Sequence, residues 1–271
     1  MNPQRMEKER RPLALFQLGQ PPADLRHAHG EQADWITAAL AGTGDRPLQV
    51  IRPFLDEVLP APGTLAGAVF SGSWSMVTDR EAWSERTAQW IREAMAVELP
   101  LLGICYGHQL MAHALGGVVK DHPQGREVGI QHIHLSAAAR HDPLLADFPD
   151  TFTANLTHQQ SVLVPPPGAV VLGHSAHDPH QILRYGPHAL SVQFHPEFFP
   201  ELMRACLMRR EDVLCREGFD VPAICAALEP TPQAREVLRQ FAAELAIQPG
   251  PTIRRFRIEP AATSAAVPRS T

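Results

Sequence analysis

Short apolar runs alternate with amphipathic segments along the first half of the chain. Apolar runs bounded by Gly, Pro or polar residues predict strands at 12–18, 47–54, 65–70 and 100–104. Helical spacing of apolar residues predicts helices at 30–42, 79–98 and 108–115, with Asp79 as the N-cap of the second. Because strands and helices take turns, we expect an α/β fold with a mostly parallel central sheet and helices on both faces.

The pattern changes in the second half of the chain. Short β-branched segments separated by turn residues predict further strands, several of them antiparallel, at 127–135, 151–156, 160–164, 169–174, 180–185 and 188–194. Helical periodicity returns at 200–217 and 232–246. This organisation predicts a disordered N-terminus at 1–11, one α/β domain at 12–200, a helical extension packed on it at 201–247, and a flexible tail at 248–271.

Composition excludes several classes of protein. The 271 residues carry a net charge of −5, which argues against a surface for nucleic acid or anionic membranes. No apolar run is long enough to span a bilayer, and residues 1–11 lack the apolar core of a signal peptide. The four cysteines are too few for a disulfide framework and form no CxxC pair. We therefore expect a cytoplasmic protein that contacts neither nucleic acid nor membrane.

The strongest chemical signal is Gly103-Ile104-Cys105-Tyr106-Gly107, between a predicted strand and a predicted helix. This is the Gly-x-nucleophile-x-Gly turn of hydrolases, with cysteine in place of serine. The two glycines leave room for a tight and strained turn. Such a turn puts the cysteine at a helix N-terminus, where the helix dipole favours the thiolate, its reactive form. The alternative is an ordinary buried cysteine.

A base and an orienting acid follow in His195-Pro196-Glu197, directly after the strand predicted at 188–194. Pro196 fixes the backbone locally, so a histidine and a glutamate two residues apart can reach one another. Together with Cys105 they predict a triad. In it, Glu197 orients the imidazole, and His195 accepts and returns the proton.

A third element follows the strand predicted at 65–70. The segment Ser71-Gly72-Ser73-Trp74 would place free backbone N–H groups at the same edge of the sheet as the cysteine. Such donors are what an oxyanion hole requires. A simple turn between a strand and a helix is the alternative reading of this segment.

Two longer motifs carry a family resemblance: LLGICYGHQLMAHALGG around Cys105 and SVQFHPEF around His195. On these motifs the chain resembles the class I glutamine amidotransferases of the triad type, over about residues 12–200. The resemblance implies a flavodoxin-like architecture and the catalytic residues Cys105, His195 and Glu197. It also implies oxyanion donors at Ser73 and Tyr106, and substrate-binding residues at Gly72, Gln109, Gln159 and Gln160.

One departure from the family concerns Gly72-Ser73-Trp74, where many members have Gly-Gly-Pro or Asn-Gly-Pro. In this respect the chain looks more like stand-alone members, including plant γ-glutamyl peptidases, than like domains fused to a synthetase. The sequence also contains no Gly-rich phosphate loop. We therefore expect no ATP-dependent ligation by this chain alone, and a separate synthetase subunit is the partner that an ammonia-delivering role would need.

The resemblance implies hydrolysis of the γ-amide of glutamine, or of a γ-glutamyl compound, through a γ-glutamyl thioester. The expected partner is this small-molecule substrate, and no cofactor or metal is expected. The alternative is a non-catalytic regulatory or binding subunit that retains the fold.

Several other histidines and cysteines need an interpretation. His174, His177 and His180 lie three residues apart, so a zinc site is an alternative to a hydrogen-bonded loop. His108 either lines the pocket or is an ordinary helix residue. The cysteines in the C-terminal region are interpreted as core thiols: Cys206, Cys215 and Cys225.

Overall fold

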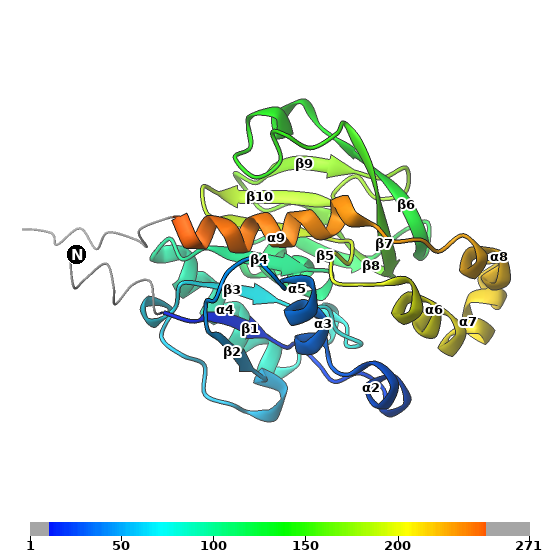
Figure 1. The fold of residues 1–271 in the computed structure, drawn as a ribbon, viewed down its shortest axis with the longest axis horizontal. Helices are drawn as coiled ribbons and strands as arrows, with labels where there is room; N and C mark the ends of the chain where they lie inside the picture. The colour runs from blue at the N-terminus through cyan, green and yellow to red at the C-terminus, as the bar shows by residue number, and fades with distance from the viewer. Residues whose placement is uncertain (1–10, 248–271) are drawn as a thin grey trace, which may run out of the picture.

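A nine-stranded sheet forms the centre of the computed structural model, which describes residues 11–247 (Figure 1). The strand order is β2-β1-β3-β4-β11-β10-β9-β6-β7. Neighbours are parallel through the first five of these strands: β2 (Leu48–Ile51), β1 (Leu13–Phe16), β3 (Gly67–Phe70), β4 (Leu101–Ile104) and β11 (Ala189–Val192). The segments at 1–10 and 248–271, which include the predicted flexible tail, lie outside the described residues.

The remaining strands of this sheet are antiparallel to their neighbours: β10 (Ile182–Gly186), β9 (Val170–His174), β6 (Glu127–Leu135) and β7 (Thr151–His158). A separate two-stranded sheet pairs β5 (Val118–Asp121) with β8 (Gln160–Val164). The predicted change from parallel to antiparallel strands in the second half of the chain is confirmed.

Both faces of the parallel region are covered by helices because alternate residues of each strand point to opposite faces. In β1, Leu13 and Leu15 belong to the core that includes α3 (Gln32–Ala39) and α9 (Pro232–Ile247). Ala14 and Phe16 belong to the opposite core, with α4 (Ala82–Ala96) and α5 (Tyr106–Ala114). The expected α/β fold with helices on both faces is therefore confirmed.

The C-terminal helices pack in two places (Figure 1). Helix α9 crosses the sheet, and its Val237, Leu238 and Phe241 join the core of that face. A third core unites the helices beside the carboxyl ends of the parallel strands: α2 (Ala23–His29), α6 (Pro200–Arg209), α7 (Glu211–Arg216) and α8 (Val221–Ala226). These helices therefore stand next to the edge of the sheet where the predicted triad residues lie.

Two predicted helices differ from the structure. The helix expected at 79–98 begins at Ala82, because Val77–Asp79 forms a 3₁₀ turn and Arg80 has a positive φ of 53°. Asp79 is therefore not the N-cap. The helix expected at 200–217 is interrupted at Arg210, whose φ and ψ of −107° and 11° are not helical. The elements that the sequence analysis did not predict include α2, β5 and α8.

Candidate active site

Cys105 occupies a sharp turn between β4 and α5 with a φ of +50°, which is strained for a residue with a side chain. The turn is tight enough to exclude other residues at both flanking glycines. A Cβ on Gly107 would lie 2.5 Å from the carbonyl oxygen of Phe70, and one on Gly103 would lie 2.6 Å from the carbonyl oxygen of Gly107. The predicted reason for the two glycines is confirmed, and the sulfur lies at the N-terminus of α5.

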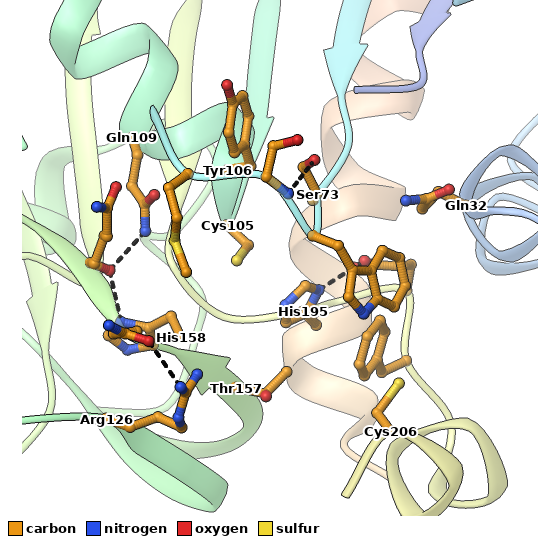
Figure 2. Close-up of a pocket in the computed structure, with 18 of the residues that line it drawn as sticks. Gln32, Ser73, Cys105, Tyr106, Gln109, Arg126, Thr157, His158, His195 and Cys206 are labelled. Atoms are coloured by element: carbon orange, nitrogen blue, oxygen red, sulfur yellow. Dashed lines mark hydrogen bonds and ion pairs between the residues drawn. The ribbon is translucent and has the colours of Figure 1, made fainter. Parts of the chain in front are cut away.

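The three residues of the predicted triad line one pocket at this turn. Figure 2 shows Cys105 and His195 close to one another in it. His195 Nδ1 lies 2.8 Å from Glu197 Oε1, and both side chains are buried. The Cys105 sulfur also lies close enough to the imidazole to act on its charge. The backbone N–H of His195 donates to the carbonyl of Asn155 at 2.9 Å, and its ring stacks on Phe198. The histidine is thus held from several directions.

The electrostatics of the site favour a protonated histidine. Burial by itself lowers the pKa of His195, but the carboxylate of Glu197 and the sulfur of Cys105 outweigh burial and raise this pKa to about 10. An imidazolium between a carboxylate and a thiol is the arrangement that stabilises a thiolate as a nucleophile. The site can therefore activate a sulfur and supply a proton.

Two backbone N–H groups beside the sulfur are unpaired. Within residues 11–247, the N–H groups of Ser73 and Tyr106 donate no hydrogen bond to the protein. The Tyr106 side chain points away from the site, since its hydroxyl lies 2.8 Å from Ser84 Oγ. The backbone at Gly72 passes so close to the imidazole that a side chain would not fit, because a Cβ there would lie 2.9 Å from His195 Cε1. The arrangement suits an oxyanion hole.

A pocket with about 680 Å³ of empty space, which includes space open to solvent, lies beside Cys105. All four predicted substrate-binding residues line it: Gly72, Gln109, Gln159 and Gln160. The side-chain amides of the three glutamines form hydrogen bonds within the protein. Gln109 Nε2 donates to the carbonyl of Gln160 at 2.6 Å, and Gln160 Nε2 donates to Thr78 Oγ1 at 2.6 Å. Gln159 Oε1 accepts from Arg126 at 2.8 Å. These contacts order the wall of the pocket.

A buried polar network behind that wall was not predicted. Glu127 accepts hydrogen bonds from His158, Ser175 and Gln181 at 2.9, 2.6 and 2.7 Å. His158 lines the pocket, and its Nδ1 lies 3.0 Å from the carbonyl of Gln160. The strand at 127–135 was predicted, but an alternating pattern does not reveal that its first residue is a buried carboxylate.

The pocket lining also includes residues for which the sequence analysis predicted no role in the site. They are Gln32, Trp35, Arg126, Phe198, Cys206 and Arg210. Both amide atoms of Gln32 are buried without a partner among the described residues. Because these residues come from α3, α6 and loops far apart in sequence, only the folded chain brings them together.

The other candidate positions are structural. His177 Nε2 lies 3.1 Å from the carbonyl of Gly125, and His180 Nδ1 lies 2.6 Å from that of Val162, so these rings do not converge with His174. No group of three metal-ligating side chains is found within residues 11–247. His108 is fully buried with Nδ1 2.6 Å from Ser191 Oγ, and burial lowers its pKa to about 3. It does not line the pocket.

Two of the three remaining cysteines, Cys206 and Cys225, are buried as expected, whereas Cys215 is exposed and corrects that interpretation. Cys215 lies in the short α7, which turns this residue toward solvent. Among the helices of the described region, none combines the length and the apolar character needed to cross a bilayer.

Comparison with known proteins agrees with this geometry. The sequence profile described as glutamine amidotransferase class-I matches residues 57–213, which is more than half of the chain. The chain belongs to the class I glutamine amidotransferase family. This family and the names of the relatives below confirm the expected enzyme type, a glutamine amidotransferase or hydrolase.

This chain covers different shares of the length of its curated relatives. A GMP synthase [glutamine-hydrolyzing] of Thermomicrobium roseum is 37% identical over 48% of this chain but only 23% of its own length. The chain thus spans about a quarter of the GMP synthases that it matches. Gamma-glutamyl peptidase 2 of Arabidopsis thaliana is 26% identical over 73% of this chain and 80% of its own length.

Solved structures support the fold. A glutamine amidotransferase of Thermotoga maritima superimposes with a TM-score of 0.68 at 19% identity, covering 87% of this chain and 99% of that one. One from Methylobacillus flagellatus gives a TM-score of 0.64 at 22% identity, covering 88% and 94%. At such identities the similarity establishes only the fold of this amidotransferase.

Proposed function

We propose that this family member hydrolyses the γ-amide of glutamine or of a γ-glutamyl compound, with Cys105 as nucleophile and His195 and Glu197 completing the triad. One observation carries the proposal: a cysteine strained at the start of α5 lies against a histidine whose other ring nitrogen is 2.8 Å from a buried carboxylate. A structural cysteine has no need of such partners.

The reaction follows from these positions. The Cys105 thiolate attacks the γ-carbonyl, and the N–H groups of Ser73 and Tyr106 hold the negative oxygen of the tetrahedral intermediate. As this intermediate collapses, the C–N bond breaks and His195 gives its proton to the leaving ammonia or amine. The γ-glutamyl thioester remains. Water then attacks the thioester, His195 accepts the proton of the water, and glutamate leaves as the thiolate returns.

The remaining predicted residues have supporting roles in this proposal. Glu197 keeps the imidazole in the orientation and tautomer that the transfer needs. Gly72 permits the loop to pass beside the histidine, and Gln109 holds the backbone of Gln160 in place through its 2.6 Å hydrogen bond. The segment that contains Gln159 and Gln160 then forms the part of the pocket wall that faces the glutamyl part of the substrate.

Two substrate classes fit the relatives. The chain matches about one quarter of the length of the GMP synthases, whose name specifies glutamine hydrolysis. A role of that kind would include a separate synthetase subunit that consumes the ammonia. The γ-glutamyl peptidase of Arabidopsis thaliana matches over 80% of its length. This wider coverage supports independent cleavage of γ-glutamyl compounds as the first substrate class to test.

The decisive experiment is a panel of glutamine, γ-glutamyl peptides and γ-glutamyl amines, with released glutamate measured for the wild type and for Cys105→Ala. We expect turnover of at least one compound and none by the variant. A glutamine-analogue diazo-ketone should label Cys105, as detected by peptide mass spectrometry. A wild type that neither turns over any compound nor becomes labelled would be a regulatory subunit, which contradicts the proposal.

A further inference from the structure

Two arginines that are not part of the proposed triad line the active-site pocket. Arg126 precedes β6, and Arg210 lies at the break between α6 and α7. Both guanidinium groups line the same pocket as Cys105, and the charges of Cys105 and Arg126 both act on Arg210. The mechanism described above uses neither of them.

The two guanidinium groups differ in how they are paired. Arg126, with a side chain only 8% exposed, lies 3.1 Å from Glu217 and donates to Gln159 Oε1 at 2.8 Å. Arg210 forms no side-chain hydrogen bond or ion pair with any described residue. Arg210 is nevertheless partly buried, and burial, followed by the like charge of Arg126, lowers its pKa.

A half-buried cation beside a second cation is unfavourable unless an anion joins them. Glu217, the carboxylate whose charge acts on Arg210, is already bound to Arg126. The break in the helix at Arg210 also matters, because it turns the chain at the residue whose side chain lines the pocket. Arginine is well suited to such a position, since its planar fork binds a carboxylate through two hydrogen bonds.

We propose that Arg210, supported by Arg126, forms a carboxylate-binding subsite of the active-site pocket, which selects γ-glutamyl substrates by a carboxylate remote from the scissile amide. This inference deepens the proposed function and rests on it for the identity of the substrate. The carboxylate has two sources: the α-carboxylate of the glutamyl group, or a carboxylate on the leaving amine. The experiments below distinguish them.

The first experiment does not depend on turnover. Cys105 is alkylated in parallel with iodoacetate, which is anionic, and iodoacetamide, which is neutral, and the rates at Cys105 are followed by peptide mass spectrometry. Both reagents need the same thiolate, so the ratio of the two rates cancels any change in thiolate fraction. We expect Arg210→Gln to lower the iodoacetate-to-iodoacetamide ratio about 10-fold, and Arg210→Lys to lower it less.

A matched control is available in the adjacent residue. Arg209 carries the same charge but pairs with Asp24 at 2.6 Å on the exposed side of α6. Arg209→Gln should leave the ratio of rates unchanged. Thermal unfolding of each variant shows whether it is folded. An unchanged ratio in folded Arg210→Gln overturns the subsite, whatever the protein hydrolyses.

The second experiment identifies the source of the carboxylate. The wild type and Arg210→Gln are compared on γ-glutamylglycine, on γ-glutamylmethylamide, and on the same two compounds with the α-carboxylate amidated. A rise in KM of about 10- to 100-fold with little change in kcat is expected for the compounds that use the subsite. If the two γ-glutamylglycine compounds are affected and the two methylamides are not, the leaving group supplies the carboxylate.

If both compounds with a free α-carboxylate are affected equally, the glutamyl group supplies it. Equal kinetics of the two proteins on all four compounds overturn the proposal. If the wild type hydrolyses none of them, the proposed function fails, and the alkylation ratio still decides whether the subsite exists.

Discussion

Glu197 Oε1 lies 2.8 Å from His195 Nδ1, with a single proline between the two residues in the sequence. The pair begins three residues after the end of β11, so the sheet helps to fix where the imidazole stands relative to Cys105 at the end of neighbouring β4. A fixed, buried carboxylate beside a buried imidazole sets both its charge and its orientation. Two predictions follow from this one contact.

Glu197→Gln should reduce kcat by about 10²–10⁴ while changing KM little. The substitution keeps the shape of the side chain but removes the charge that holds the imidazole protonated and oriented. Steady-state kinetics on the best substrate of the panel measure the effect. Circular dichroism serves as the check on folding. A folded variant with the kcat of the wild type would show that Glu197 plays no part in the reaction.

The raised pKa of His195 also predicts a pH dependence of stability. A protonated group whose pKa is higher in the folded than in the unfolded chain stabilises the fold fully below the unfolded value and loses this effect as the pH rises through the folded value. The unfolded value is 6.5 and the folded value about 10. The free energy of unfolding of wild type relative to His195→Asn should therefore be highest below pH 6.5 and decline toward pH 10.

Urea unfolding at several pH values measures this difference. Repeating the measurement in a Cys105→Ala background is a useful control, because the sulfur contributes to raising the pKa of His195. Its removal should make the change of this free-energy difference with pH smaller. A difference between wild type and His195→Asn that stays constant from pH 6 to pH 10 would contradict the assigned electrostatics.

The parts of the fold that the sequence predicted are those governed by local pattern. The strand ending before Cys105 and the helix after it follow from an apolar run, two glycines and helical spacing, and the structure has β4 and α5 there. The positions of the proposed triad residues were predictable for the same reason, since each motif is short and continuous. Parallel strands that end together then bring Cys105 and His195 to one edge.

The rest of the site depends on contacts between distant segments. Arg210 reaches the pocket only because α6 and α7 pack with α2 in a core of their own. Glu127 is buried because β6 and β7 pair in one particular register, with Glu127 opposite His158. Neither register nor helix docking is encoded in the periodicity of one segment, so sequence patterns did not identify these residues.

The narrow space beside the histidine predicts a specific effect for Gly72→Ala. The added Cβ would lie 2.9 Å from His195 Cε1, so the imidazole or the loop must move. A displacement of about 1 Å in a catalytic group can cost about 10²-fold in rate, and we expect a loss of that order in kcat/KM.

Gly63→Ala is the matched control for this substitution, because no atom lies within 4 Å of a Cβ at that position. It should leave kcat/KM unchanged. Full activity of Gly72→Ala would mean that the loop carrying Ser73 is free to shift without disturbing the reaction, which contradicts the tight packing described above.

The last prediction concerns Gln32, which is 1% exposed and whose amide oxygen and nitrogen both lack a partner among the described residues. A buried polar group without a hydrogen bond destabilises the fold, so Gln32→Met should raise the stability by about 1–3 kcal/mol. Thermal unfolding measures the change. Gln17→Met is the control, since Gln17 is equally buried but donates to Gly19 and Glu31 at 3.1 and 2.7 Å, and its loss should lower the melting temperature. A lower melting temperature for Gln32→Met would mean that water satisfies its amide.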